Sequence, residues 1–322
     1  MLGAFTLSMA LGEQPLDYHL VLVPGTPEET IFFSLRLPRV VLAAIVGVAL
    51  STSGATLQPL LRNPLADPFV LGVSGGAALG ATVALALGLP SFALLPGVSP
   101  TSVLALGGAA GATALVLTIG RWARGDVAHT TLLAGVILNS IALAAITFIK
   151  ALVAPDRLGE VLFWLTGSLG QETTATLIAT ALAVALAVGV MVALSGRLNL
   201  LMLGEEDAHS LGVDVGSTRR WLLAAASVAV AAVVSVSGLV GFVGLVVPHL
   251  VRLLFGVDQR VAVPVSALVG ATFLMLADLL ARVLFRAFHT EPPVGAITAL
   301  VGGVAFLVLM ARAKSSGSAR LG

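Results

Sequence analysis

Cysteine is absent from the sequence, and charged side chains are scarce, at 10% of 322 residues. Without cysteine, the chain can form neither disulfide bonds nor metal sites with thiolate ligands. The formal net charge of +1 excludes the broadly basic surface that nucleic-acid binding requires. The histidines have neither the i,i+4 spacing nor the neighbouring carboxylates of a metal site; they are His19, His129, His209, His249 and His289. We therefore expect no metal site and no nucleic-acid partner.

A phosphate-binding loop is also missing, because no G-x-x-x-x-G-K-[ST] string occurs in the sequence. We therefore expect no cofactor in this chain and no enzymatic activity of its own. Any ATP and Mg²⁺ would be bound by a partner subunit, and ATP hydrolysis would take place there.

Apolar residues dominate the composition instead, at 58% of the chain with a mean hydropathy of +1.06. These values are typical of helical proteins that cross a membrane several times. The 35 glycines suit close packing of helices in lipid, and the alternating pattern of a transmembrane barrel is absent. We predict an all-α polytopic membrane protein with a single transmembrane domain over residues 1–322.

Each membrane span requires roughly 20 apolar residues. The apolar segment from Met1 to Leu11 is shorter than this, so we expect either a truncated first helix, with the native start upstream, or a stub. Residues 16–34 contain prolines and glutamates, which predicts an exposed connection. The remaining segments are predicted at about 38–58, 69–89, 101–120, 131–153, 173–194, 222–240, a broken return at 241–255, 262–284 and 294–311. With the first segment they number ten, which places both ends of the chain on one side.

The distribution of the 17 Lys and Arg residues orients the chain, because such residues are enriched in cytoplasmic loops. Most of them lie on the side that carries residues 197–220, so we expect that side to be cytoplasmic. Arg36 and Arg39 fall on the opposite side, where they oppose the rule locally and require another reason.

Residues 197–220 form the longest strongly polar break in the sequence. Acidic residues favour the first turn of a helix, and a glycine just beyond the last turn permits the left-handed residue that ends one. We predict a short helix at about 205–211 within this segment. The segment is either an ordinary solvated connection or a docking handle for a soluble partner. Leu211 and Val213 would then provide most of the affinity, through buried apolar area. The residues of the handle are Gly204, Glu205, Glu206, Asp207, Ala208, His209, Ser210, Leu211 and Gly212.

Two interruptions of the apolar pattern indicate backbone that is shielded by protein or lines a path. The first is the proline-bounded turn at 63–68, followed by Ser74, Gly75 and Gly76. The second is the glycine repeat at 238, 241 and 244. Close packing of helices through glycine is the alternative explanation for both.

Several motifs together resemble the permeases of iron-siderophore, haem and vitamin B12 ABC importers. They are RLPR at 36–39, NPLADP at 63–68, LGVSGG at 71–76, LLAGV at 132–136, GFVGLVVPHLVR at 241–252 and PVG at 293–295. The resemblance extends from about Gly12 to Met310 with the motifs in the same order. It implies a ten-helix ABC-importer permease subunit in the bacterial cytoplasmic (inner) membrane.

The resemblance also implies partners and roles for individual residues. It implies a homodimer around one translocation path, with two ATPase subunits below it and an extracytoplasmic substrate-binding protein above. The helix at 204–212 would be the coupling element that sits in an ATPase cleft. Arg36, Arg39 and Arg282 would meet acidic residues of the binding protein; the alternative is that they extend toward lipid headgroups.

The resemblance places a cytoplasmic gate near Ala128, His129 and Thr130, where the match to the family is loose. Asn139 either faces the translocation path or makes a hydrogen bond between helices. Asp278 is an acid deep in an apolar run, and Arg282 follows at the i+4 position. We favour an ion pair between Asp278 and Arg282 over proton coupling.

Residues 164–170 predict an external interfacial or re-entrant helix with a glycine end.

Taken together, the sequence features and the resemblance predict a permease subunit that works by ATP-driven alternating access. The cargo would be an iron-siderophore, haem or cobalamin. An ion-coupled secondary transporter and a non-transporting membrane scaffold are the alternatives.

Overall fold

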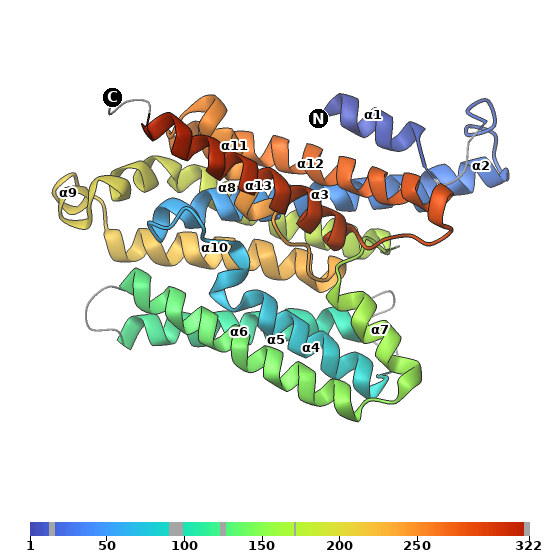
Figure 1. Ribbon diagram of the computed structural model, residues 1–322, viewed down its shortest axis with the longest axis horizontal. Helices are drawn as coiled ribbons and strands as arrows, with labels where there is room; N and C mark the ends of the chain where they lie inside the picture. Colours follow the sequence, from blue (N-terminus) through green and yellow to red (C-terminus); the bar gives the residue numbers. More distant parts are fainter. Residues whose placement is uncertain (13–16, 90–98, 123–126, 171, 319–322) are drawn as a thin grey trace.

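The computed structural model describes residues 1–12, 17–89, 99–122, 127–170 and 172–318, and these residues contain helices and no strands (Figure 1). The prediction of an all-α chain is therefore confirmed. The elements are α1 (Leu2–Ala10), α2 (Pro27–Glu29), the π-helix η1 (Thr30–Arg36), α3 (Leu37–Leu60), the 3-10 helix η2 (Pro68–Leu71), α4 (Val73–Leu87), α5 (Pro100–Trp122), α6 (Val127–Leu152), α7 (Pro155–Leu165), α8 (Thr174–Leu203), α9 (Glu205–Ser210), α10 (Val215–Ser237), α11 (Val243–Phe255), α12 (Gln259–Phe288) and α13 (Val294–Ser318).

Helix α3 lies at the centre of the fold, where it contacts α8, α10, α11 and α12. Glycines make these contacts close. A Cβ atom built on Gly47 would lie 2.2 Å from the carbonyl oxygen of Gly270 in α12, and one built on Gly54 would lie 1.8 Å from that of Gly244 in α11. Backbones approach this closely only where side chains are minimal. At Gly47 and Gly54 the helices therefore meet backbone to backbone, while Leu42, Leu50 and Leu57 of α3 are buried around these contacts.

A second group of helices, α4 to α7, lies beside the first in Figure 1, with α4 packed against α5, α6 and α7. The predicted span at 69–89 consists of two pieces here, because Gly72 has a left-handed φ of 79° between η2 and α4. A Cβ atom on Gly76 would lie 2.3 Å from the carbonyl oxygen of Gly108, so α4 and α5 also meet through small residues.

Six described helices are long and apolar enough to span a membrane, and shorter apolar helical segments cover Val73–Leu87, Val243–Phe255 and Val294–Val308. Helix α1 has nine residues, which corresponds to about 13 Å and is less than half of a bilayer's hydrocarbon core. The predicted segments therefore match the helices, and most boundaries agree within a few residues.

Several boundaries in the sequence-based prediction are wrong; for example, α10 begins at Val215 rather than near residue 222. Helix α8 continues through Arg197 to Leu203, because Asn199 accepts a hydrogen bond from the backbone N–H of Gln259 (2.8 Å) and donates one to Asp258 (2.6 Å). These contacts hold the end of α8 against the start of α12. The expected connection at 16–34 becomes helical at Pro27, because the Thr26 side chain accepts a hydrogen bond from the backbone of Glu29.

The expected helix with a glycine end at 164–170 is shifted in the structure. Helix α7 begins at Pro155 and ends at Leu165, and Gly167 follows with a φ of 74°. The glycine therefore ends the helix as predicted, whereas the helix itself precedes most of the expected segment.

Candidate functional site

Two polar sites lie at opposite ends of the helical bundle in Figure 1. Helix α9 is at one end, and the junctions around α2, α7 and the start of α13 are at the other. The apolar spans connect the two ends.

Helix α9 is a short exposed helix of six residues with a defined stop, as the sequence predicts. Gly204 precedes it with a φ of 145°, and three acids occupy its first turn. At its end, Gly212 N–H donates to His209 O (2.9 Å) and Val213 N–H donates to Ala208 O (3.0 Å). This pair of bonds is the Schellman arrangement, and the left-handed Gly212 (φ 83°) makes it possible.

The side chains around α9 divide into those that hold it and those that are available to a partner. Ala208 and Val213 are buried and anchor the helix. The expectation that Val213 provides affinity for a partner is therefore wrong, because its side chain belongs to this chain's own core. Leu211 is 60% exposed, and Leu203 at the end of α8 is exposed as well. Glu205 forms an ion pair with Arg219 of α10.

The opposite end holds a cluster of arginines and carboxylates drawn from distant parts of the chain. Asp278 is completely buried and forms ion pairs with Arg282 (2.9 Å) and Arg39 (2.8 Å). The predicted pair between Asp278 and Arg282 is therefore confirmed. Arg39 also forms hydrogen bonds with Glu291 through both of its terminal nitrogens. Asp278 thus joins α12 to α3 at this end.

Arg36 and Arg282 instead hold the end of α1. Arg36 donates to the carbonyl oxygen of Met9 (3.0 Å), and Arg282 donates to those of Ser8 (3.1 Å) and Leu11 (3.3 Å). The last carbonyls of a helix lack partners within it and carry partial negative charge, so two guanidinium groups stabilise them. Both arginines are buried in this role.

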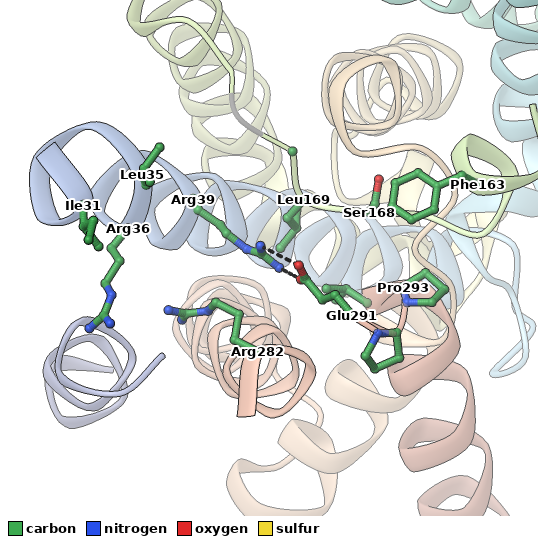
Figure 2. Close-up of a pocket in the computed structure, with 13 residues that line it drawn as sticks. Ile31, Leu35, Arg36, Arg39, Phe163, Ser168, Leu169, Arg282, Glu291 and Pro293 are labelled. Atoms are coloured by element: carbon green, nitrogen blue, oxygen red, sulfur yellow. Dashed lines mark hydrogen bonds and ion pairs between the residues drawn. The ribbon is translucent and has the colours of Figure 1, made fainter. Parts of the chain in front are cut away.

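A cavity of about 400 Å³ opens beside this cluster and is lined by Arg36, Arg39, Arg282, Glu291 and apolar residues, among them Phe163 and Leu169. Figure 2 shows Arg36 and Arg282 on one side of Arg39 and Glu291 on the other. The three arginines predicted for docking therefore lie together. Their engagement with a binding protein stays a prediction.

Glu291 is the residue of this cluster that sequence reasoning missed. It lies 252 positions from Arg39 in the chain, in the short connection between α12 and α13. Its position before Pro292 and Pro293 carries no local signal of an ion pair. Only the packing of α3 against α12 brings the two side chains together.

Asn139 makes hydrogen bonds between helices, which was one of its two predicted roles. Its side-chain oxygen accepts from the backbone N–H of Gly75 (3.0 Å), and its side-chain nitrogen donates to the carbonyl of Phe69 (2.8 Å). Ser74 also donates to Phe69 O (3.2 Å). Asn139 therefore fixes the break between η2 and α4, and Gly75 and Gly76 pack closely against α6 and α5.

The predicted gate residues fall at the start of α6. Thr130 lies in its first turn and is partly buried. Ala128 and His129 lie outside the residues whose side chains the structure describes.

In the described part of the chain, no group of three or more His, Asp or Glu side chains could hold a metal ion.

The sequence matches the FecCD transport family over residues 1–312. It is 45% identical to the cobalamin import system permease protein BtuC of Halobacterium salinarum over 288 residues, which cover 89% of this chain and 75% of that protein. It is 42% identical to the hemin transport system permease protein HmuU of Yersinia pestis over 290 residues, which cover 89% and 85%. It is also 38% identical to the Fe(3+) dicitrate transport system permease protein FecC of Escherichia coli over 304 residues, which cover 92% and 88%.

The fold is similar to a solved structure described as an inward-facing conformation of a metal-chelate type ABC transporter. The TM-score is 0.86 at 31% sequence identity, and the alignment covers 97% of this chain and 96% of that one. Because the family match spans nearly the whole chain and these relatives align over most of their length, this chain belongs to the FecCD transport family.

Proposed function

We propose that this chain is the permease subunit of an ATP-driven importer in the bacterial inner membrane. The observation that supports this most directly is the exposed, capped helix α9 at the end of the bundle opposite the arginine cluster. An ATPase subunit would bind α9, and a substrate-binding protein would bind the other end. Two copies of the chain would form the translocation path between them.

The cargo is proposed to be an iron-siderophore, haem or cobalamin. The relatives are named for cobalamin, hemin and ferric dicitrate, all of which are metal chelates. The path would be lined by α6 and the start of α4, whose residues are mostly small and apolar. Such a wall suits a large chelate that must be released without tight binding.

Force would pass from α9 into the membrane through the two helices that flank it. Helix α9 contacts α8 and α10, and the pair between Glu205 and Arg219 ties it to α10. Closure of the ATPase subunits would therefore tilt α8 and α10 together. Alternating access follows when this tilt closes one end of the path and opens the other.

The ion-coupled alternative has little support in the chain. Asp278 is the only Asp or Glu in the sequence of α3, α4, α5, α6, α8, α10, α11, α12 and α13. It is held by two arginines, one at each carboxylate oxygen, so neither oxygen lacks a cationic neighbour. Import that persists when uncouplers collapse the proton gradient would separate the two mechanisms.

Substitution at the exposed tip of α9 tests the proposal. We expect Leu211→Asp to weaken binding of the ATPase subunit by more than about tenfold, because burying a leucine contributes about 2 kcal/mol. ATP-dependent import in proteoliposomes should fall with it. Leu22→Asp is the matched control, because Leu22 is 81% exposed in the loop before α2 at the opposite end.

Unchanged ATPase binding and import in Leu211→Asp would contradict the coupling role of α9. Equal losses in the two variants would show a general effect of the charge rather than a contact with the ATPase.

A further inference from the structure

The cavity beside Arg39 contains a carboxylate of the chain's own, that of Glu291. Among the described residues, Arg36, Arg39 and Arg282 line this cavity together with Glu291. Arg36 and Arg282 are committed to the end of α1, and Asp278 is fully buried between two arginines. Glu291 is the exception, because its side chain is 31% exposed and lies in a short connection.

The two carboxylates differ in how easily an arginine can leave them. Separating Asp278 from its arginines would leave a buried charge without a partner, which is strongly unfavourable. The Glu291 side chain is 31% exposed, so water can solvate its carboxylate when it leaves Arg39, and Arg39 keeps its ion pair with Asp278. In the described part of the chain, its side chain contacts no donor other than Arg39. Glu291 can therefore leave Arg39 without breaking a second ion pair.

Arg282 lines the same cavity of about 400 Å³ but stays with the end of α1. Figure 2 shows its guanidinium group pointing away from Arg39 and Glu291. Among the described residues its Nη2 has no hydrogen-bond partner, but that atom is itself buried. A carboxylate that entered the cavity would therefore find the paired nitrogens of Arg39.

We propose that this cavity is a carboxylate-exchange site, in which Glu291 occupies Arg39 until an acidic side chain of the binding protein replaces it. The inference rests on the proposed function, since it requires a docking partner. It assigns different roles to the three arginines. Arg39 is the exchangeable contact, whereas Arg36 and Arg282 hold α1.

The test measures affinity for the binding protein of the same importer, with the permease and ATPase complex in nanodiscs. Glu291→Gln removes the competing charge while keeping the shape of the side chain. We expect it to raise the affinity about two- to fivefold at low ionic strength, the scale of a partly exposed ion pair. The gain should shrink as salt is added. Arg39→Gln should lower the affinity.

Two further variants separate competition from a general change of charge. Glu160→Gln removes an acid from an exposed position of α7, and we expect a smaller effect. In the double variant Arg39→Gln with Glu291→Gln, the gain from Glu291→Gln should vanish, because nothing is left to compete for. The effect of Glu160→Gln should be the same with or without Arg39.

A gain of equal size in Glu160→Gln and Glu291→Gln, or a gain that survives in the Arg39→Gln background, would overturn the exchange. Lower or unchanged affinity in Glu291→Gln would overturn it as well. In each of these cases wild-type binding and ATP-dependent import remain, so the proposed function stands. Absence of any binding to the wild-type complex would instead overturn the proposed function.

Discussion

At the scale of single residues, Asp67 carries a carboxyl group in surroundings that favour its neutral form. It lies in the turn between α3 and η2, outside the spans, and accepts a hydrogen bond from the backbone N–H of Phe69 (2.9 Å). Burial raises the pKa of Asp67 to about 6, and the bond from Phe69 opposes this only in part. Asp67 therefore caps η2, and ionisation of its buried carboxyl group destabilises the folded state.

This raised pKa predicts a specific dependence of stability on pH. An acid with a raised pKa in the folded state loses stability as pH rises from its ordinary value of 3.8 to about 6, and the loss is constant above that. Asp67→Asn keeps an acceptor for the cap but cannot ionise. We expect this variant to melt several degrees above wild type at neutral pH and to lose the advantage in acid. Melting temperatures in detergent across this range are the measurement.

Asp258 provides a contrast of opposite sign. Hydrogen bonds from Asn199 and from the backbone of Arg260 lower the pKa of Asp258, so its contribution is present at neutral pH and is lost as pH falls. Asp258→Asn should therefore melt below wild type at neutral pH. A difference in melting temperature between Asp67→Asn and wild type that does not change with pH would contradict the role assigned to Asp67.

At the scale of elements, glycine contacts determine how closely α3 approaches its neighbours. Gly54 meets the backbone of Gly244, and Gly47 meets that of Gly270. The glycines at 238, 241 and 244 recur regularly in the sequence, but they have different roles in the structure. Gly238 has a φ of 64° just after α10, Gly244 packs against α3, and Gly241 has open space around it.

We expect Gly54→Ala to destabilise the chain by about 3 kcal/mol, because its Cβ would overlap a backbone that cannot move independently. Gly189→Ala in α8 is the control, since nothing lies within 4 Å of its Cβ. Alanine is the better helix former there, by up to about 1 kcal/mol. Melting in detergent measures both, and equal behaviour of the two variants would contradict the packing role.

The helix boundaries also show which features of the fold a sequence pattern can predict. The spans at 38–58, 101–120 and 262–284 were predicted within a few residues of α3, α5 and α12, because bilayer thickness fixes the length of apolar runs. The end of α8 was missed, because its last turns contain Arg197 and Asn199 and are held by contacts to α12. No local pattern contains those contacts.

At the scale of the whole molecule, the function depends on which end faces the cytoplasm. The absence of native cysteine makes the orientation directly measurable. Ser210 is exposed in α9, and Leu22 is exposed at the opposite end. The variants Ser210→Cys and Leu22→Cys therefore each carry a single reactive thiol at a known end.

We expect a membrane-impermeant maleimide to label Leu22→Cys and to leave Ser210→Cys unlabelled in right-side-out membranes. Inverted vesicles should give the opposite pattern, because α9 is proposed to face the ATPase. Each variant should retain import, which shows that the labelled protein is folded. Labelling of Ser210→Cys from outside would reverse the orientation and contradict the proposed mechanism.

The sequence by itself determined the helical class, the approximate spans, the stop of α9 at Gly212 and the ion pair between Asp278 and Arg282. Each of these depends on neighbours within a few residues or on the thickness of the bilayer, so a local pattern is sufficient. Only the tertiary structure decided that Val213 is buried, that Asn139 braces the start of α4, and that Arg39 contacts Glu291. These contacts join segments far apart in the chain, and they exist only because α3, α4 and α6 pack as they do.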